Sequence, residues 1–252
     1  MSKPKISAVI ITRNESKNIE AAIESLDFAD QVVVADTSSE DETVELARKT
    51  GAEVHGIPFR GFGASKNMAL EFCTGDWIFS LDADERVSPE LSHSVLEAVN
   101  NADGHDCYGV NRLTYFLGKP IRHSGWFPDY VVRLFKKGYG FSEKQVHESL
   151  ETGGNVGRLQ GLLLHHSYRD LDRYFEKLNF YTSLNAGEMI REGKKGSLID
   201  VIIHPPATFL KMFIFKAGFL DGMTGFVLAV LSSYQVFIKY IKLRQLTLGG
   251  GR

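Results

Sequence analysis

Two aspartates separated by one residue, Asp82 and Asp84, follow the apolar stretch WIFSL in the sequence WIFSLDADE. The stretch predicts a buried parallel strand, and the carboxyl ends of such strands form the edge at which open α/β sheets bind ligands. Two carboxylates there can act differently: one binds a hard divalent cation, which prefers oxygen ligands and substrate phosphates, and the other accepts a ribose hydroxyl. The alternative is an ordinary solvated turn, which the preceding strand disfavours.

A third aspartate, Asp36, ends the apolar run in VVVADTSSEDET and reaches the same predicted edge. Its carboxylate can accept the ring N–H of a uracil. It can equally be an anion at the start of the following helix, beside Ser39, where the helix dipole favours negative charge. The residues alone leave both roles open.

Two common nucleotide-binding motifs are missing from the sequence. The first predicted strand ends in ITRNE instead of a glycine-rich turn, so the dinucleotide fingerprint is absent where it would have to act. The segment GFGASK does not follow that strand, lacks the third glycine and is not a P-loop. These observations argue against nicotinamide enzymes, kinases and ATPases.

The elements that would position these residues alternate between short β-branched runs and stretches of helical period. This pattern predicts parallel strands joined by crossover helices, and therefore an α/β fold, up to about residue 112. The predicted strands cover residues 6–12, 31–36, 52–55 and 77–81. The predicted helices cover residues 16–26, 39–49 and 88–101, and the second opens with a capping box between Ser39 and Glu42.

Beyond Cys107 the alternation gives way to three strand-like segments, CYGVNRLTYF, YVVRLFKK and VGRLQGLLLHH. Glycine-rich and aromatic loops separate them, and a binding site can be built in such loops. Residues 170–192 have the composition of a helix. From residue 199 onward the sequence is aromatic, aliphatic and basic, which indicates a separate C-terminal module.

Within this module, residues 223–238 carry no charged side chain, but the run of about 16 residues is shorter than the ~20 that cross a bilayer. Lysines flank it and aromatic residues are interleaved, as is typical of an element lying on anionic lipid. We therefore predict an interfacial or re-entrant helix. A buried helical hairpin and a homodimer interface are the alternatives.

The composition limits the partners and the compartment. A chain of 252 residues, 43% of them hydrophobic, can bury a full core, and its formal net charge of −2 lacks the basic surplus that nucleic-acid binding requires. Cys73 and Cys107 lie in apolar segments without zinc-site spacing, so free thiols and a reducing compartment are expected. The first apolar run ends at Thr12, too early for a signal peptide, so we expect a cytoplasmic protein.

Four segments, ITRNE, VVVADTSSEDET, ASKNMAL and GDWIFSLDADE, resemble in order and spacing the nucleotide-binding half of family 2 glycosyltransferases with the GT-A fold. Later segments, WFPDYVVRLFKK, VHESL, HHSYRDLDRY and FLDGMTGF, are similar to the branch that contains lipopolysaccharide inner-core β-glucosyltransferases. The resemblance implies a GT-A catalytic domain over residues 1–198, with a Rossmann-like, mainly parallel sheet flanked by helices. Residues 1–112 would be its nucleotide-binding half, residues 113–198 its acceptor half, and residues 199–252 a C-terminal helical module.

The resemblance also implies a pocket for the nucleotide sugar. The residues at matching positions are Thr12, Arg13 and Glu15 after the first strand, Asp36 for the base, Lys66 and Asn67, and Asp82 for the ribose. The family usually has Arg-Asn where Lys66 and Asn67 stand. Lysine keeps the positive charge but lacks the bidentate fork of arginine.

A metal and a catalytic base are implied in the same way. Asp84 would bind Mg²⁺ or Mn²⁺, and a histidine of LLLHHSY would complete the site, with the register favouring His165 over His166. Glu148 in VHE is the first choice for the carboxylate that takes the proton of the acceptor hydroxyl, and Asp129 in WFPDY is its rival.

Two further residues, Arg133 and His123, are candidates for stabilising the leaving diphosphate, with ordinary strand or loop positions as the alternative.

The expected function is therefore an inverting transfer of a sugar, glucose from UDP-glucose, onto lipopolysaccharide core or another lipid-linked glycan at the inner face of the cytoplasmic membrane. One alternative is a capsule or polyprenyl-phosphate acceptor with a different nucleotide sugar. Another is an inactive nucleotide-sugar-binding protein.

Overall fold

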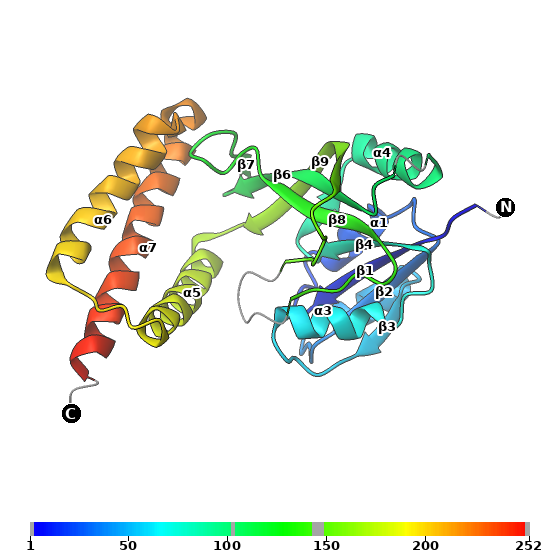
Figure 1. Ribbon diagram of the computed structural model, residues 1–252, viewed down its shortest axis with the longest axis horizontal. Helices are drawn as coiled ribbons and strands as arrows, with labels where there is room; N and C mark the ends of the chain where they lie inside the picture. Colours follow the sequence, from blue (N-terminus) through cyan, green and yellow to red (C-terminus); the bar gives the residue numbers. More distant parts are fainter. Residues whose placement is uncertain (1–2, 102–103, 143–148, 250–252) are drawn as a thin grey trace. The chain divides into compact units, whose positions relative to one another are not determined.

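The structure, a computed structural model, describes residues 3–101, 104–142 and 149–249. The chain forms two compact units. The first contains Met1–Arg112 and Asp129–His165, and the second contains Leu113–Pro128 and His166–Arg252. Figure 1 follows the chain from blue at the N-terminus to red at the C-terminus.

A mixed sheet forms the centre of the first unit. Its parallel part consists of β1 (Ile6–Thr12), β2 (Gln31–Asp36), β3 (Glu53–Gly56) and β4 (Trp77–Asp82), in the order β3-β2-β1-β4. The order continues with β8 (Tyr130–Lys136), β6 (Cys107–Phe116), β9 (Val156–Tyr168) and β5 (Glu85–Val87), and the short β7 (Lys119–Pro120) pairs with β6. The predicted α/β class is confirmed, and the four predicted parallel strands are present.

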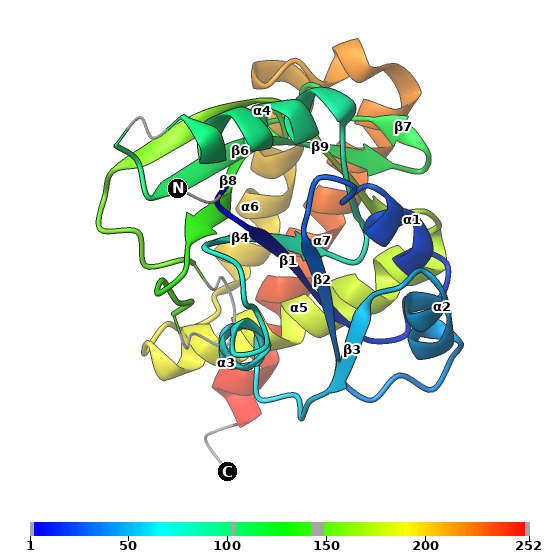
Figure 2. The same ribbon diagram turned by 90° about the vertical axis from the view of Figure 1, so that its right-hand side faces the viewer.

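Helices cover both faces of the parallel part, as Figures 1 and 2 show. These are α1 (Ile19–Glu24), α2 (Thr43–Lys49) and α4 (Pro89–Asn100) on one face and α3 (Phe62–Leu70) on the other. Successive side chains of a strand point to opposite faces, so Ala8 and Ile10 of β1 join one hydrophobic cluster and Val9 joins the other. Residues buried on both faces explain the continuous apolar runs.

The second helix is shorter than the predicted segment 39–49. It begins at Thr43, and its N-cap Glu42 makes no side-chain capping hydrogen bond. Ser39 instead donates its hydroxyl and its backbone N–H to the carboxylate of Asp36. The predicted capping box is therefore wrong, because the turn after β2 uses the Ser39 hydroxyl.

Helices dominate the second unit. They are α5 (Leu171–Arg191), α6 (Leu198–Leu210), a π-helix (Lys211–Phe215), a 3₁₀-helix (Gly218–Asp221) and α7 (Gly222–Gly249). Both α5 and α6 pack along α7. Their shared core contains Phe116, Ile121, Tyr174, Leu178, Met212, Leu228 and Ala229.

Asp221 joins the segment after β6 to the C-terminal helices. Its carboxylate accepts hydrogen bonds from the backbone N–H groups of Arg122, at 3.2 Å, and His123, at 2.9 Å. The His123 ring Nδ1 lies 2.9 Å from Asp221 Oδ1. Close packing also requires Gly225, since a β-carbon there would lie 2.0 Å from the carbonyl oxygen of Gly218. The FLDGMTGF segment thus builds a tight helical turn that clamps a loop.

The division into units differs from the predicted boundary between residues 198 and 199. Tyr174 and Leu178 of α5 are buried in the same core as Leu228 of α7, so α5 belongs with the C-terminal helices. Leu113–Pro128 belongs there as well, because Phe116 lies in this core.

Two helical segments, Leu198–Phe215 and Gly218–Gly249, are long and apolar enough to cross a membrane by length and composition. In their most apolar windows, 11% and 17% of the residues are buried. The helix α7 is longer than the uncharged run at residues 223–238, because it continues through Lys239, Lys242 and Arg244.

Candidate active site

The carboxyl ends of β1, β2 and β4 bring polar side chains to one edge of the sheet. In the parallel register Thr12 pairs with Asp36, and Ile11 pairs with Asp82. Thr12 and Asp36 are buried, and among the described residues the Thr12 hydroxyl has no hydrogen-bond partner. The positions predicted to bind base and ribose therefore share this edge, while their roles stay predictions.

Asp82 lies between two cations. Its Oδ1 is 3.3 Å from Lys66 Nζ, and its Oδ2 is 2.6 Å from Arg133 Nη2. Burial raises the pKa of the Asp82 carboxyl, but the charges of Arg133 and Lys66 outweigh this effect and hold the pKa well below its ordinary value. Asp82 is therefore an anion at neutral pH, and its pairing is lost only as the pH falls below that ordinary value.

Glu85 is a fully buried carboxylate behind the turn, and sequence reasoning missed it. Its Oε1 lies 2.6 Å from Arg133 Nη2 and 3.5 Å from Arg112 Nη1. Its Oε2 accepts the backbone N–H of Asp82 at 3.1 Å. The sequence does contain a signal, because Arg112 and Arg133 stand inside apolar strands and buried guanidinium groups need anionic partners.

Asp84 and His165 approach each other across the pairing of β5 with β9. Glu85 is paired with His165 in that register, and His165 Nε2 lies 3.4 Å from Asp84 Oδ1. Both side chains are largely buried. His166 is in the second unit, where its ring stacks on Tyr115 at a centroid distance of 4.6 Å. The structure therefore places His165 next to Asp84.

The chemistry of this pair fits a divalent cation that substrate phosphates help to bind. One carboxylate and one imidazole provide an oxygen and a nitrogen ligand, and Mg²⁺-type sites are commonly completed by phosphate oxygens and water. Among the described residues no group of three or more His, Cys, Asp or Glu side chains is arranged to hold a metal. Metal binding by Asp84 and His165 stays a prediction.

The neighbouring residues Lys66 and Asn67 of α3 make different contacts. Lys66 is buried, pairs with Asp82 and lies 5.2 Å from the ring centroid of Phe141. Asn67 donates to the Phe141 carbonyl at 2.9 Å and accepts the Phe141 N–H at 2.7 Å. The amide of Asn67 thus holds the backbone at Phe141, a contact that sequence reasoning did not foresee.

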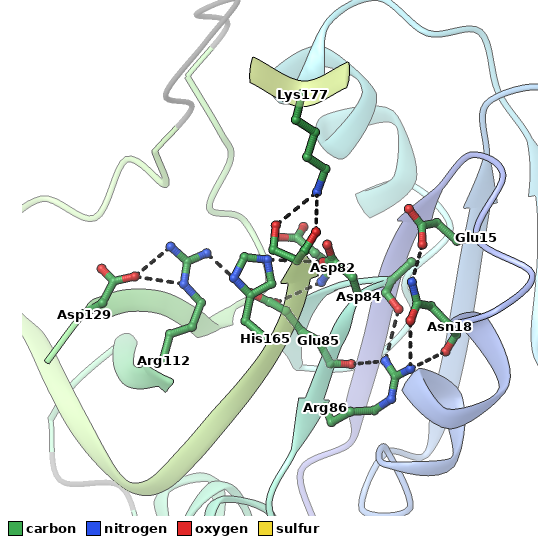
Figure 3. A network of polar contacts seen from close by, with 12 residues as sticks. Glu15, Asn18, Asp82, Asp84, Glu85, Arg86, Arg112, Asp129, His165 and Lys177 are labelled. Atoms are coloured by element: carbon green, nitrogen blue, oxygen red, sulfur yellow. Dashed lines mark hydrogen bonds and ion pairs between the residues drawn. The ribbon is translucent and has the colours of Figure 1, made fainter. Parts of the chain in front are cut away.

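Two loop residues after β1 were predicted to line the nucleotide pocket. Arg13 is exposed, and Glu15 Oε2 accepts a hydrogen bond from Asn18 Nδ2. Figure 3 shows Glu15 and Asn18 in one polar network with Asp82, Asp84 and their partners. The network extends from the loop after β1 to β8 and β9.

Comparison with known proteins identifies the family. Residues 7–164 match glycosyl transferase family 2. The chain belongs to glycosyltransferase family 2. The first unit, whose mixed sheet carries an acidic turn at the end of the parallel strand β4, accordingly has the GT-A fold.

Full-length relatives of this glycosyltransferase include an uncharacterized glycosyltransferase of Rickettsia typhi, 31% identical over 97% of this chain and 88% of the relative. The lipopolysaccharide core biosynthesis glycosyltransferase LpsC of Rhizobium meliloti is 31% identical over 94% of both chains. A solved structure, glucosyl-3-phosphoglycerate synthase of Mycobacterium tuberculosis with Mn²⁺ and UDP, is 25% identical over 44% of both chains, with a TM-score of 0.38.

The structure describes one of the two candidate bases of the glycosyltransferase. Glu148 lies outside the described residues. Asp129 Oδ2 accepts two hydrogen bonds from Arg112, from Nε at 2.9 Å and from Nη2 at 2.7 Å. Arg112 in turn approaches Glu85, so Asp129 ends a chain of alternating charges that includes Arg133 and reaches Asp82.

The two candidates for stabilising the leaving diphosphate, Arg133 and His123, belong to different units. Arg133 is in the site, buried between Asp82 and Glu85. Despite the opposing effect of burial, these two carboxylates raise the pKa of its guanidinium above the ordinary value, so it stays charged. His123 is in the second unit, where it pairs with Asp221.

Proposed function

We propose that this glycosyltransferase is an inverting enzyme that moves glucose from UDP-glucose onto lipopolysaccharide core or another lipid-linked glycan. Similarity to LpsC over 94% of both chains supports this class of acceptor. The observation that carries the donor chemistry is the pairing of Asp84 with His165, beside Asp82, at the ligand-binding edge of the sheet.

Asp84 and His165 would hold Mg²⁺ or Mn²⁺ in this proposal. The bound cation would neutralise the charge that develops on the leaving diphosphate. Lys66 provides a further positive charge, 3.3 Å from Asp82 Oδ1, for a phosphate oxygen to contact. Asp82 accepts a ribose hydroxyl, and its lowered pKa keeps it an acceptor at neutral pH.

Inversion needs a carboxylate that takes the proton of the acceptor hydroxyl while its oxygen attacks the anomeric carbon. Glu148 is our first choice. Asp129 is less suited, because two hydrogen bonds from Arg112 already occupy its Oδ2.

Glu148→Gln is expected to lower kcat by ~10²-fold or more while donor affinity stays nearly unchanged, because a general base acts only in the chemical step. Initial rates and titration with UDP in the presence of Mn²⁺ measure the two quantities. Asp129→Asn is the matched comparison. If Asp129→Asn shows this pattern and Glu148→Gln keeps full activity, the two roles must be exchanged.

A lipid-linked acceptor requires the enzyme to reach a membrane, and we propose that the turn between α6 and α7 docks on an anionic lipid surface. Large apolar side chains are exposed around this turn, and we call them the docking face: Leu210, Ile214, Phe215, Phe219, Leu220, Met223, Phe226 and Val230. Exposed Lys211 and Lys216 lie in the same stretch. Each contributes roughly 1 kcal/mol near anionic lipid, and apolar burial contributes about 25 cal/mol per Å².

The double substitution Phe215→Ser and Met223→Ser is expected to weaken binding to anionic vesicles by ~10²-fold, because each buried side chain contributes about 1.5–3 kcal/mol. The two residues are 81% and 73% exposed, so we expect the fold to tolerate the change. Phe180→Ser on α5, 53% exposed, is the control. If the double variant sediments with vesicles like wild type but no longer forms a dimer in solution, the docking face is instead a homodimer interface.

A screen of UDP-, GDP- and ADP-sugars by thermal unfolding, each with and without Mn²⁺, tests the proposed function. UDP-glucose with Mn²⁺ is expected to give the largest rise in Tm, since a ligand of the native state raises apparent stability. Product analysis then follows glucose release or transfer. A preference for another nucleotide would contradict the donor, and binding without turnover would indicate an inactive nucleotide-sugar-binding protein.

A further inference from the structure

Arg86 holds the backbone on both sides of Asp84. Its Nη1 donates to the carbonyl oxygen of Ala83 at 3.1 Å and to that of Glu85 at 2.7 Å. Asp84 stands between these two residues in the chain, and Figure 3 shows the Arg86 guanidinium at the base of the turn. A single nitrogen therefore binds one carbonyl before and one carbonyl after the predicted metal ligand in the chain.

The other side of the same guanidinium reaches the start of α1. Its Nη2 donates to the Asn18 backbone carbonyl at 2.8 Å and lies 3.4 Å from the Asn18 side-chain oxygen. The Asn18 amide nitrogen donates to Glu15 Oε2. Asn18 is 4% exposed, so this connection is shielded from water.

Arginine is suited to this position because its planar guanidinium presents five N–H donors in a fixed fork. A lysine ammonium is a compact point charge that cannot contact the carbonyls of the turn and of Asn18 with the same geometry. Displacing ligands by about 1 Å is enough to lower a rate by ~10²-fold.

We infer that Arg86 is a positioning residue of the donor site: it fixes the turn that carries Asp84 and, through Asn18, orients the Glu15 carboxylate. Arg86 thereby sets the metal-binding and the nucleotide-binding sides of the site relative to each other. The inference rests on the proposed function and extends it to a residue outside the predicted ligand set.

Arg86→Lys is expected to raise the Kd for UDP in the presence of Mn²⁺ by ~10-fold or more, and the KM for the donor with it, while kcat changes less. The affinity for UDP without metal falls by a smaller factor, because the restraint lost at the Ala83 and Glu85 carbonyls acts mainly on Asp84, the predicted metal ligand.

Asn18→Asp separates this role from simple support of the fold. The substitution keeps an oxygen acceptor for Arg86 but replaces the donor that faces Glu15, so that two carboxylates meet. If Arg86 acts through Asn18 on Glu15, this variant loses UDP affinity although its contact to Arg86 gains charge. If Arg86 only supports the fold, this variant binds UDP like wild type.

Calorimetric titration of the full chain with Mn²⁺ alone, UDP alone and UDP with Mn²⁺ measures these effects, and thermal unfolding reports folding. Arg158→Lys, an exposed arginine on β9, is the control and should leave all three affinities unchanged. Wild-type affinity for UDP with Mn²⁺ in either Arg86→Lys or Asn18→Asp would overturn the inference alone. No binding of UDP with Mn²⁺ by the wild type would overturn the proposed function and the inference with it.

Discussion

Replacing Asp84 by alanine is expected to abolish the Mn²⁺-dependent part of donor binding and to lower transfer activity by ~10²-fold or more. The cation would lose its carboxylate ligand, leaving His165 as its predicted protein ligand, 3.4 Å from the missing oxygen. The diphosphate would then leave without the charge compensation that a metal supplies, which is worth several kcal/mol in the transition state.

Titration of the Asp84→Ala variant with UDP, with and without Mn²⁺, measures the metal-dependent part. Asp106→Ala is a suitable control, because Asp106 is a half-exposed aspartate that pairs with Lys136. Equal affinity of wild type and Asp84→Ala for UDP with Mn²⁺ would show that the metal is bound elsewhere or is not needed.

Glu85→Leu is expected to lower the free energy of unfolding by about 3–5 kcal/mol, the usual cost of removing one partner from a buried ion pair. Glu85 is fully buried, and its Oε1 is 2.6 Å from the guanidinium of Arg133. Without it, Arg133 keeps Asp82 as its charged partner among the residues that the structure describes, and Arg112 keeps Asp129. Urea denaturation of both proteins gives the difference.

A double-mutant cycle separates this pairing from loss of packing. Arg133→Met is also expected to destabilise the protein, but Glu85→Leu combined with Arg133→Met should cost less than the sum of the two single changes by about 1–3 kcal/mol. Lys136→Met removes an exposed charge from the same strand and should change stability little. Additive costs would mean that Glu85 and Arg133 act independently.

The parallel strands could be predicted from the sequence because each is a continuous apolar run that ends at a polar residue. For β1 and β2, the predicted and observed bounds agree, from Ile6 to Thr12 and from Gln31 to Asp36. Burial on both faces produces this signal without reference to the rest of the fold. The position of Asp82 at the sheet edge followed from the same pattern.

Contacts made by polar side chains over long sequence distances could not be predicted in the same way. Ser39 stands where a helix cap was expected, yet its hydroxyl bonds Asp36, and this choice depends on how the chain leaves β2. Asn67 contacts Phe141, which lies 74 positions along the chain. In the sequence, Glu85 resembles an exposed turn residue. Only the pairing of distant strands brings Arg133 and Arg112 beside it.

The clamp made by Asp221 bears on how the C-terminal helices can be separated from the rest of the protein. Asp221 binds residues of the internal segment Leu113–Pro128, which lies in the chain between strands of the sheet. The C-terminal tail that carries Asp221 and this internal segment therefore share one core. A chain cut before Pro205 would remove Met212, Leu228 and Ala229 from the core that Phe116 and Tyr174 share with them, and its insolubility could follow from this exposed core. The tail and the internal segment should instead evolve together, so that substitutions at Asp221 among relatives coincide with changes at His123.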